Sequence, residues 1–292
     1  MSDFGLLSCY LGIEVVQKKG EITLSQRSYA EKILEQAGMR ECNSCSTPME
    51  CRLKLKKEDG SKPFDATLYR SVIGSLRYLV HTRPDIAHAV GIVSRFMENP
   101  STSHWAAVKQ ILRYIHGTKQ YGCTYTAGSG SAELLGYSDS DHASDLGDRK
   151  STSGQVFFLG QNPVSWTSQK QKVVAISSFE AEYVTAAAAT CQGIWLSRLL
   201  ADLLGTGPEK FTLLVDNKSA IALAKNPVFH DRSKHIDVKF HFIRDCVEEK
   251  VLEIEHVGTH NQLADILTKA LERVRFIEMQ QKLAVMEGSK KP

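Results

Sequence analysis

The sequence predicts an α/β protein in which a mixed five-stranded sheet flanked by helices follows a smaller hairpin and helical region. Apolar side chains recur at helical spacing over residues 66–118. After residue 131, strand-like runs alternate with helical ones instead. A polar stretch over residues 40–65 separates a short hairpin from the helices. A chain of 292 residues is long enough for about two domains.

The first elements are a hairpin and a helix. YLGIEVVQ (residues 10–17) is rich in β-branched side chains and predicts a strand, and EITLS (21–25) pairs with it across the KKG turn. Ser25 is a suitable cap for a helix that continues to Ala37. Residues 40–65 contain two prolines and are expected to form an exposed linker.

Three helices are expected next, at residues 68–80, 85–97 and 103–115. Pro84 permits a new helix to begin, and Pro100 ends the second one. Because the connections are short, these helices are expected to pack as a small bundle or subdomain.

The α/β part begins with three strands that form an antiparallel meander, followed by a long helix capped by Ser177 or Ser178 and closed by Gly205. Two further strands and three further helices follow. The strands are expected at 134–140, 153–160, 163–169, 211–217 and 251–257, and the helices after the long one at 219–225, 232–250 and from 260 onward.

Acidic residues occur at recurring positions in this part. They lie at the centre of the first strand, near the start of the long helix, at the end of the fourth strand and near the start of the last helix. These residues are Asp139, Glu182, Asp216 and Asp265. Each alone has an ordinary structural explanation as a turn former or a helix-dipole partner. Together they can meet at one edge of a mixed sheet, where hard oxygen ligands suit magnesium or manganese.

Two of these positions have close acidic neighbours. Strand alternation puts Asp139 and Asp141 on the same face, so periodicity leaves both open as the first ligand. Glu180 and Glu182 are two residues apart on a helix and cannot both point inward. Asp145 and Asp148, which follow the first strand, are typical of turn acids.

Four ordered motifs carry a resemblance to a known family. They are YSDSDHASDLGDRKSTSGQVFFLG, PVSWTSQKQKVVAISSFEAEYVTAAAA, LLVDNKSAIALAKNPVFHDRSKHIDVKFHFIRD and HNQLADILTKAL. Residues 136–270 thereby resemble the ribonuclease H domain of copia-type long-terminal-repeat retrotransposons. The resemblance implies a ribonuclease H-like fold that cleaves the RNA strand of RNA–DNA hybrids with two Mg²⁺ ions, for which Mn²⁺ can substitute. It implies that the catalytic, metal-binding quartet is Asp139, Glu182, Asp216 and Asp265, and it favours Asp139 over Asp141 and Glu182 over Glu180.

Accessory residues are expected around the quartet. A basic helix face suggests phosphate contacts by Lys234, His235, Lys239 and Arg244, although a solvated helix face explains the same pattern equally well. The resemblance also suggests a histidine that helps product to leave, with His256 and His260 as the candidates.

The first 130 residues resemble the end of the reverse transcriptase of the same elements. DFGLLSCYLGIEVVQKKGEITLSQRSYAEKILEQAGM resembles the last palm strands, and the region from Tyr69 to Thr118 resembles thumb and connection. No Y-x-D-D motif occurs in the sequence, so DNA polymerisation is not expected. The expected organisation of this truncated polyprotein is a palm remnant and linker at 1–60, a helical segment at 61–130, a ribonuclease H-like domain at 131–275 and a tail at 276–292.

Composition adds weaker constraints. The net charge of +3 does not by itself indicate a nucleic-acid partner, although KLKKEDGSK and KQILRYIHGTK are basic. Seven scattered cysteines favour a reduced intracellular compartment, and no basic, apolar leader of a secretory signal is present. The resemblance implies a cytoplasmic location, with the nucleus as the alternative. Cys42 and Cys45 form one C-x-x-C without a second pair, which argues against zinc. No apolar run reaches eighteen residues, so no membrane span is expected.

Two functions are therefore predicted. The first is a ribonuclease H-type endonuclease that acts on RNA–DNA hybrids. The alternative is a catalytically inactive nucleic-acid-binding relic, or a binding module recruited by the host, that uses the helices of residues 66–118 and the basic runs.

Overall fold

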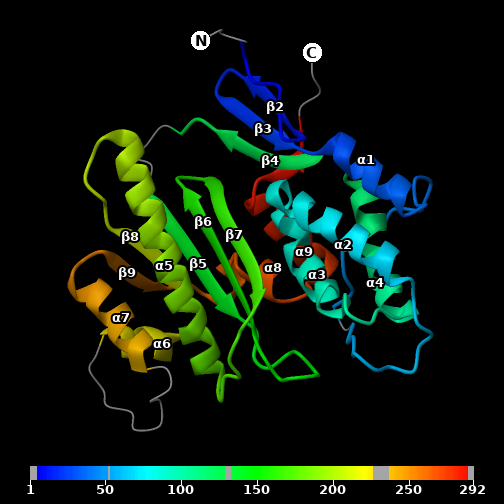
Figure 1. Cartoon of the computed structure of the whole chain (residues 1–292). Coiled ribbons are helices and arrows are strands. Elements are labelled where there is room, and N and C mark those ends of the chain that lie inside the picture. Colours follow the sequence, from blue (N-terminus) through cyan, green and yellow to red (C-terminus); the bar gives the residue numbers. More distant parts are fainter. Residues whose placement is uncertain (1–4, 52, 129–132, 226–236, 289–292) are drawn as a thin grey trace. The chain divides into compact units, whose positions relative to one another are not determined.

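The computed structural model of the chain divides into two compact units (Figure 1). The structure describes residues 5–51, 53–128, 133–225 and 237–288. The first unit contains residues 1–127 and 269–292, and the second contains residues 128–268. The second unit is thus inserted into the sequence of the first.

The first unit contains an antiparallel sheet with the strand order β1-β2-β3-β4-β10. The strands are β1 (Cys9–Tyr10), β2 (Ile13–Lys18), β3 (Glu21–Ser25), β4 (Tyr121–Thr126) and β10 (Val285–Glu287). The pairing of Lys18 with Glu21 closes the β2–β3 hairpin, which confirms the predicted hairpin. The strands β4 and β10, which extend the sheet beyond β3, were not predicted from the sequence.

Helices from both segments of the first unit accompany this sheet. They are α1 (Arg27–Gln36), α2 (Ala66–Leu79), α3 (Ala87–Val93), α4 (Thr102–Gly117) and α9 (Arg273–Lys282), with 3₁₀ turns η1 (Val80–Thr82), η2 (Pro84–Ile86) and η3 (Ser94–Phe96). The Asp65 carboxylate caps α2 by accepting from the backbone N–H of Thr67 at 2.8 Å. The single helix expected at 85–97 is wrong in detail, because 3₁₀ turns replace both of its ends.

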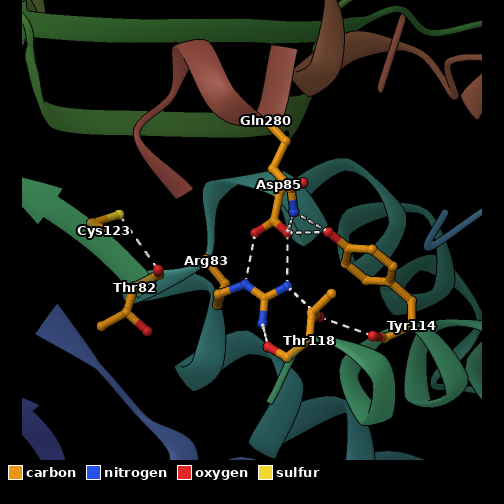
Figure 2. Close-up of polar contacts among 7 residues, drawn as sticks. All are labelled: Thr82, Arg83, Asp85, Tyr114, Thr118, Cys123 and Gln280. Carbon is orange, nitrogen blue, oxygen red and sulfur yellow. Dashed lines mark hydrogen bonds and ion pairs between the residues drawn. The ribbon is translucent and has the colours of Figure 1, made fainter. Parts of the chain in front are cut away.

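A buried polar network joins the helices of the first unit (Figure 2). The Arg83 guanidinium donates to both carboxylate oxygens of Asp85, at 2.9 and 2.8 Å. The Tyr114 hydroxyl of α4 and the Gln280 amide of α9 donate to the same carboxylate. Because the buried carboxylate has donors from three segments, α9 is held in the first unit by hydrogen bonds as well as by apolar contacts.

This arrangement corrects the expected organisation of the chain. Residues 276–292 were expected to be a tail, but they supply most of α9 and the strand β10. Residues 1–60 and 61–130 were expected to be separate segments, but β3 pairs with β4 and makes them one unit. The polar stretch at 40–65 has little regular structure, yet Met49 is buried within it, so it is anchored rather than wholly exposed.

The second unit confirms the predicted mixed five-stranded sheet, with the order β7-β6-β5-β8-β9. The strands are β5 (Leu134–Ser140), β6 (Thr152–Leu159), β7 (Asn162–Lys170), β8 (Phe211–Val215) and β9 (Leu252–His256). The strands β5, β6 and β7 are antiparallel neighbours, whereas β8 runs parallel to both β5 and β9.

The helices of the second unit are led by the long helix α5, which packs against β5, β6 and β8 (Figure 1). They are α5 (Ser178–Leu204), α6 (Lys218–Lys225), α7 (Asp237–Glu248) and α8 (Asp265–Thr268), with a 3₁₀ turn η5 (Thr259–Asn261) before α8. Ser177 caps α5 and Gly205 ends it in the left-handed conformation, both as predicted. The last predicted helix is shorter than expected, because α8 ends at Thr268 and a new helix begins at Arg273.

The core of the second unit lies between α5 and the sheet. Tyr183 and Ala186 of α5 pack with Phe157, Phe211 and Leu213 of the strands. Gly193 permits this contact, because a Cβ at that position would lie 2.2 Å from the Phe211 ring. Within the described part of the chain, none of the helices is sufficiently long and apolar to cross a bilayer.

Candidate metal centre

Three carboxylates from three different elements meet in the second unit. Asp139 lies in β5, Glu182 in the second turn of α5, and Asp216 directly after β8. One oxygen from each residue lies within 4.8 Å of the others. Asp139 and Glu182 are buried, with 2% and 7% of their surface exposed, and Asp216 is half-buried.

Strand register explains why two of these acids meet. The parallel neighbours β5 and β8 align Ser138 with Val215. The next residue after each of these two is an aspartate, Asp139 in β5 and Asp216 just past the end of β8, so both lie at the same end of the sheet.

The start of α5 brings Glu182 to the pair. The Ser177 hydroxyl accepts from the Glu180 N–H at 3.1 Å, and the Glu180 carboxylate accepts from the Ile176 N–H at 2.9 Å. These two bonds fix the first turn of the helix. One turn onward, Glu182 Oε1 accepts from the Ser140 N–H of β5 at 3.2 Å, which ties the helix to the strand carrying Asp139.

Local hydrogen bonds distinguish the members of the cluster from their acidic neighbours, which the sequence alone left as alternative ligands. The Asp141 carboxylate accepts from the Thr152 N–H at 2.6 Å and from the Ser144 hydroxyl, so it holds the turn after β5. Glu180 is likewise committed to the Ile176 N–H. Asp139 and Glu182 are therefore the members that the structure brings into the cluster.

The following acids also stabilise the turn. Asp145 accepts from the Gly147 N–H at 2.9 Å and pairs with Lys170 at 2.7 Å. Asp148 pairs with the same ammonium group at 2.8 Å. Both residues behave as the turn acids that the sequence suggested.

The electrostatics of the cluster suit a bound cation. Burial, together with the charges of Asp139 and Asp216, raises the pKa of Glu182 to about 9. Glu182 Oε2 is buried and accepts no hydrogen bond within the described structure. A cation among the three carboxylates would relieve their repulsion, and an all-oxygen donor set fits Mg²⁺ or Mn²⁺ better than zinc.

Asp265 is not a member of the cluster of three, although it lies in the same unit. It is 4% exposed at the start of α8. The Thr268 hydroxyl at the end of α8 donates to the Asp139 carboxylate, and the Gln262 amide donates to the Ser138 carbonyl at 2.9 Å. These bonds connect the segment that carries Asp265 to β5.

The other predicted site residues are more dispersed. Lys234 and His235 lie outside the described residues. Lys239 is half-buried on α7, and Arg244 of the same helix contacts His241 at 2.9 Å and Glu248 at 3.6 Å. Exposed His256 pairs in register with Val215, next to Asp216, whereas exposed His260 lies in η5. Among those of these residues that the structure describes, His256 alone is placed beside a member of the cluster by strand register.

Comparison with known proteins identifies the family. Residues 1–51 match a family model described as reverse transcriptase (RNA-dependent DNA polymerase). The retrovirus-related Pol polyprotein from transposon RE2 of Arabidopsis thaliana is 41% identical over 96% of this chain. The corresponding polyprotein from transposon TNT 1-94 of Nicotiana tabacum is also 41% identical, over 94% of this chain. The chain belongs to the Pol polyprotein family of copia-type retrotransposons.

This Pol family chain spans about a fifth of the length of those relatives, 19% of the RE2 polyprotein and 21% of the TNT 1-94 polyprotein. Among solved structures, the foamy viral protease-reverse transcriptase dRH in complex with double-stranded DNA matches 86% of this chain and 37% of its own chain, at a TM-score of 0.53. At 11% identity, that likeness shows the fold alone.

Two residues near the cluster were not predicted from the sequence: Thr268, which donates to Asp139, and Gln262, which donates to the adjacent Ser138 carbonyl. Thr268 and Gln262 lie within the HNQLADILTKAL motif, but their uncharged side chains carry no signal of a ligand. Their importance follows from hydrogen bonds to residues more than a hundred positions away, which a periodicity argument does not detect.

Proposed function

We propose that the second unit of this Pol family chain is a ribonuclease H-type endonuclease that hydrolyses the RNA strand of RNA–DNA hybrids. The observation that carries the proposal is the meeting of Asp139, Glu182 and Asp216, which come from β5, α5 and the end of β8. Buried like charges destabilise one another without a counter-ion, so their convergence is best explained by a function that uses divalent cations.

Two divalent ions are proposed as the cofactors, with the quartet Asp139, Glu182, Asp216 and Asp265 as their ligands. Such ions, when bound, activate water and stabilise the leaving oxygen of a phosphodiester. The protein's own contribution is positioning. The Ser140 N–H directs Glu182, and the aligned ends of β5 and β8 set the spacing of the two aspartates.

The nucleic-acid partner is proposed from the family and from the fold. The motifs of residues 136–270 resemble the ribonuclease H domain of these elements, and the chain belongs to their Pol family. The solved viral reverse transcriptase of similar fold is described in complex with double-stranded DNA, which supports a duplex-type partner here. Lys239 and Arg244 of α7 are proposed to contact phosphates.

The direct test is cleavage of an end-labelled RNA–DNA hybrid by the full chain, with Mg²⁺ and with EDTA. We expect cleavage of the RNA strand in Mg²⁺, with no cleavage of the DNA strand and no activity in EDTA. A folded sample that binds duplexes in a salt-dependent, EDTA-insensitive way without cutting them would contradict the proposal and favour the binding-module alternative.

Divalent ions should also stabilise the protein, and more so at higher pH. The pKa of Glu182 in the fold, about 9, lies above its ordinary value of 4.5. Between these two pH values, Glu182 therefore stays protonated in the folded state but is ionised in the unfolded state. Without ions, the free energy of unfolding falls as pH rises through that window. Since a bound cation requires the carboxylate form, the gain in melting temperature from Mg²⁺ should be larger at pH 8 than at pH 5.

Thermal unfolding in Mg²⁺ and in EDTA measures this effect. At a free ion concentration a hundredfold above the dissociation constant, one bound ion stabilises the fold by about 2.7 kcal/mol. Glu182→Gln is the control, because it removes the titrating group and should reduce both the gain and its pH dependence. A gain that is equal at pH 5 and pH 8 would count against the role of Glu182.

A further inference from the structure

The end of α8 makes an unusual contact with the candidate metal centre. Thr268 Oγ1 donates to the Asp139 carboxylate, across 129 positions in the sequence. Both side chains are buried, with Thr268 1% exposed and Asp139 2% exposed. A hydrogen bond from a buried hydroxyl to a carboxylate is strong because water does not compete for either group.

The same hydroxyl lies close to a second acceptor. Thr268 Oγ1 is 3.2 Å from the backbone carbonyl of Asp265, within its own helix. A hydroxyl has a single proton, and the charged carboxylate attracts that proton more strongly than a neutral carbonyl does. The proton therefore goes to Asp139, and Thr268 ties that carboxylate to α8, the helix that begins with Asp265, the fourth predicted ligand.

A glycine makes room for this contact. Gly154 of β6 stands directly opposite Asp139 in the antiparallel pair. A Cβ at Gly154 would lie 2.6 Å from the Thr268 methyl group and 2.9 Å from Leu267 Cβ. Because real Cβ atoms essentially never approach that closely, any larger residue at this position would push α8 away from the strand.

A second hydrogen bond holds the other end of the segment. Gln262, which is fully buried, donates to the Ser138 carbonyl at 2.9 Å and accepts from the Ala264 N–H at 3.2 Å. The segment 262–268 is thus bonded to two consecutive residues of β5. Rotation of the Asp139 side chain away from the cluster would break the Thr268 bond.

We propose that Thr268 is a positioning residue that holds Asp139 in its cation-binding orientation and keeps the helix of Asp265 beside it. This inference rests on the proposed function, since it names what prepares the same site for its ions. Thr268 touches neither ion nor substrate in this account and acts through Asp139. Residues of this kind, which orient a metal ligand, typically change metal affinity roughly tenfold to a hundredfold when replaced.

The test is the affinity of the full chain for Mn²⁺ alone, followed by the electron paramagnetic resonance signal of the free ion. Thr268→Val keeps the shape and the methyl contact at Gly154 but removes the donor, and should weaken Mn²⁺ binding by roughly tenfold or more. Thr268→Ser keeps the donor and should restore most of the affinity. Gly154→Ala, which displaces α8 sterically, should weaken binding by an independent route.

Thr190→Val is the matched control. The Thr190 hydroxyl is also fully buried and donates to the Ala186 carbonyl at 2.8 Å, but it does so within α5. Its loss should leave Mn²⁺ affinity unchanged. A Thr268→Val chain that binds Mn²⁺ as tightly as the wild type, or an equal loss in Thr190→Val, would overturn the proposal.

Two further measurements separate this inference from the proposed function. If Thr268→Val folds poorly by circular dichroism, the pair Thr268→Ser and Thr268→Ala isolates the hydroxyl, and equal Mn²⁺ affinities in that pair would overturn the proposal. In the cleavage assay, Thr268→Val should require more Mg²⁺ for half-maximal rate and recover at high Mg²⁺. If the wild type binds Mn²⁺ but does not cut hybrids, the proposed nuclease activity is refuted. The Mn²⁺ affinities of the Thr268 variants would still decide the role of Thr268.

Discussion

Asp139→Asn should abolish cleavage of an RNA–DNA hybrid, with a loss of about a thousandfold or more in rate. Such a loss corresponds to about 4 kcal/mol of transition-state stabilisation, within the several kcal/mol that a catalytic divalent ion supplies. The amide keeps the size of the side chain but removes the charge that would hold a cation together with Glu182 and Asp216. Cleavage under Mg²⁺-saturated, single-turnover conditions measures the loss.

Asp141→Asn is the matched control for this variant. Asp141 lies two residues further along the same chain segment, but its carboxylate accepts from the Thr152 N–H at 2.6 Å and from Ser144. The amide oxygen can still accept from the Thr152 N–H, and the amide NH2 group can donate to the Ser144 hydroxyl instead, so the turn should persist and activity should stay within a few fold of the wild type. Greater loss in Asp141→Asn than in Asp139→Asn would show that the ligand had been assigned to the wrong neighbour.

In the ion-free protein, Asp139→Asn should keep or raise the melting temperature although it abolishes cleavage. Asp139 is one of the two charges that raise the pKa of Glu182, after burial. Removing that charge relieves repulsion in the ion-free protein, so Asp139→Asn should melt at an equal or higher temperature than the wild type in EDTA. A thousandfold loss of activity in a protein that is no less stable would identify a functional carboxylate rather than a structural one.

The sequence predicted the second unit well because local signals agree with the fold there. Ser177 and Gly205 mark the ends of α5, and the alternating runs mark the strands of the mixed sheet. Periodicity could not distinguish Asp139 from Asp141 as the first ligand, because residues two apart on a strand point to the same face. The hydrogen bond that commits Asp141 to the turn after β5 distinguishes the two residues, and it depends on the position of Thr152 at the start of β6.

The first unit was predicted less completely because its closure is non-local. β4 and β10 are short strands whose pairing joins residues such as Cys123 and Val285. The Gln280 amide reaches Asp85 across 195 positions in the sequence. Contacts of this range leave no periodic pattern near either residue, so the end of the chain was interpreted as a tail.

Breaking the buried ion pair of the first unit should destabilise that unit by about 3–5 kcal/mol. Arg83 and Asp85 have side chains that are 1% and 0% exposed, so removing either leaves the other charge buried without its partner. Arg83→Met tests this in urea unfolding of the full chain. The second unit, which contains neither residue, should keep its own transition and its hybrid cleavage.

The double variant Arg83→Met, Asp85→Leu is the control for the charge itself. Replacing both members of a buried pair with apolar residues is often close to neutral, because neither desolvated charge remains. Here Tyr114 and Gln280 would lose a shared acceptor, so we expect a residual cost of about 1–3 kcal/mol for unsatisfied donors. A double variant as unstable as Arg83→Met would show that the network acts through its hydrogen bonds rather than through its charges.

At low pH, protonation of Asp85 should weaken the same buried network (Figure 2). Burial alone would raise the pKa of Asp85, but the charge and hydrogen bonds of Arg83, with that of Tyr114, outweigh it and hold the pKa below its usual range. A carboxyl whose pKa is lowered in the fold contributes stability above its unfolded pKa and loses it as pH falls through the folded value. The wild type should therefore lose stability below about pH 4 more steeply than the double variant, which lacks this carboxyl.

Since the same carboxylate binds Gln280, protonation of Asp85 should release α9 from the network. Faster amide exchange in residues 273–282 at low pH would detect that release.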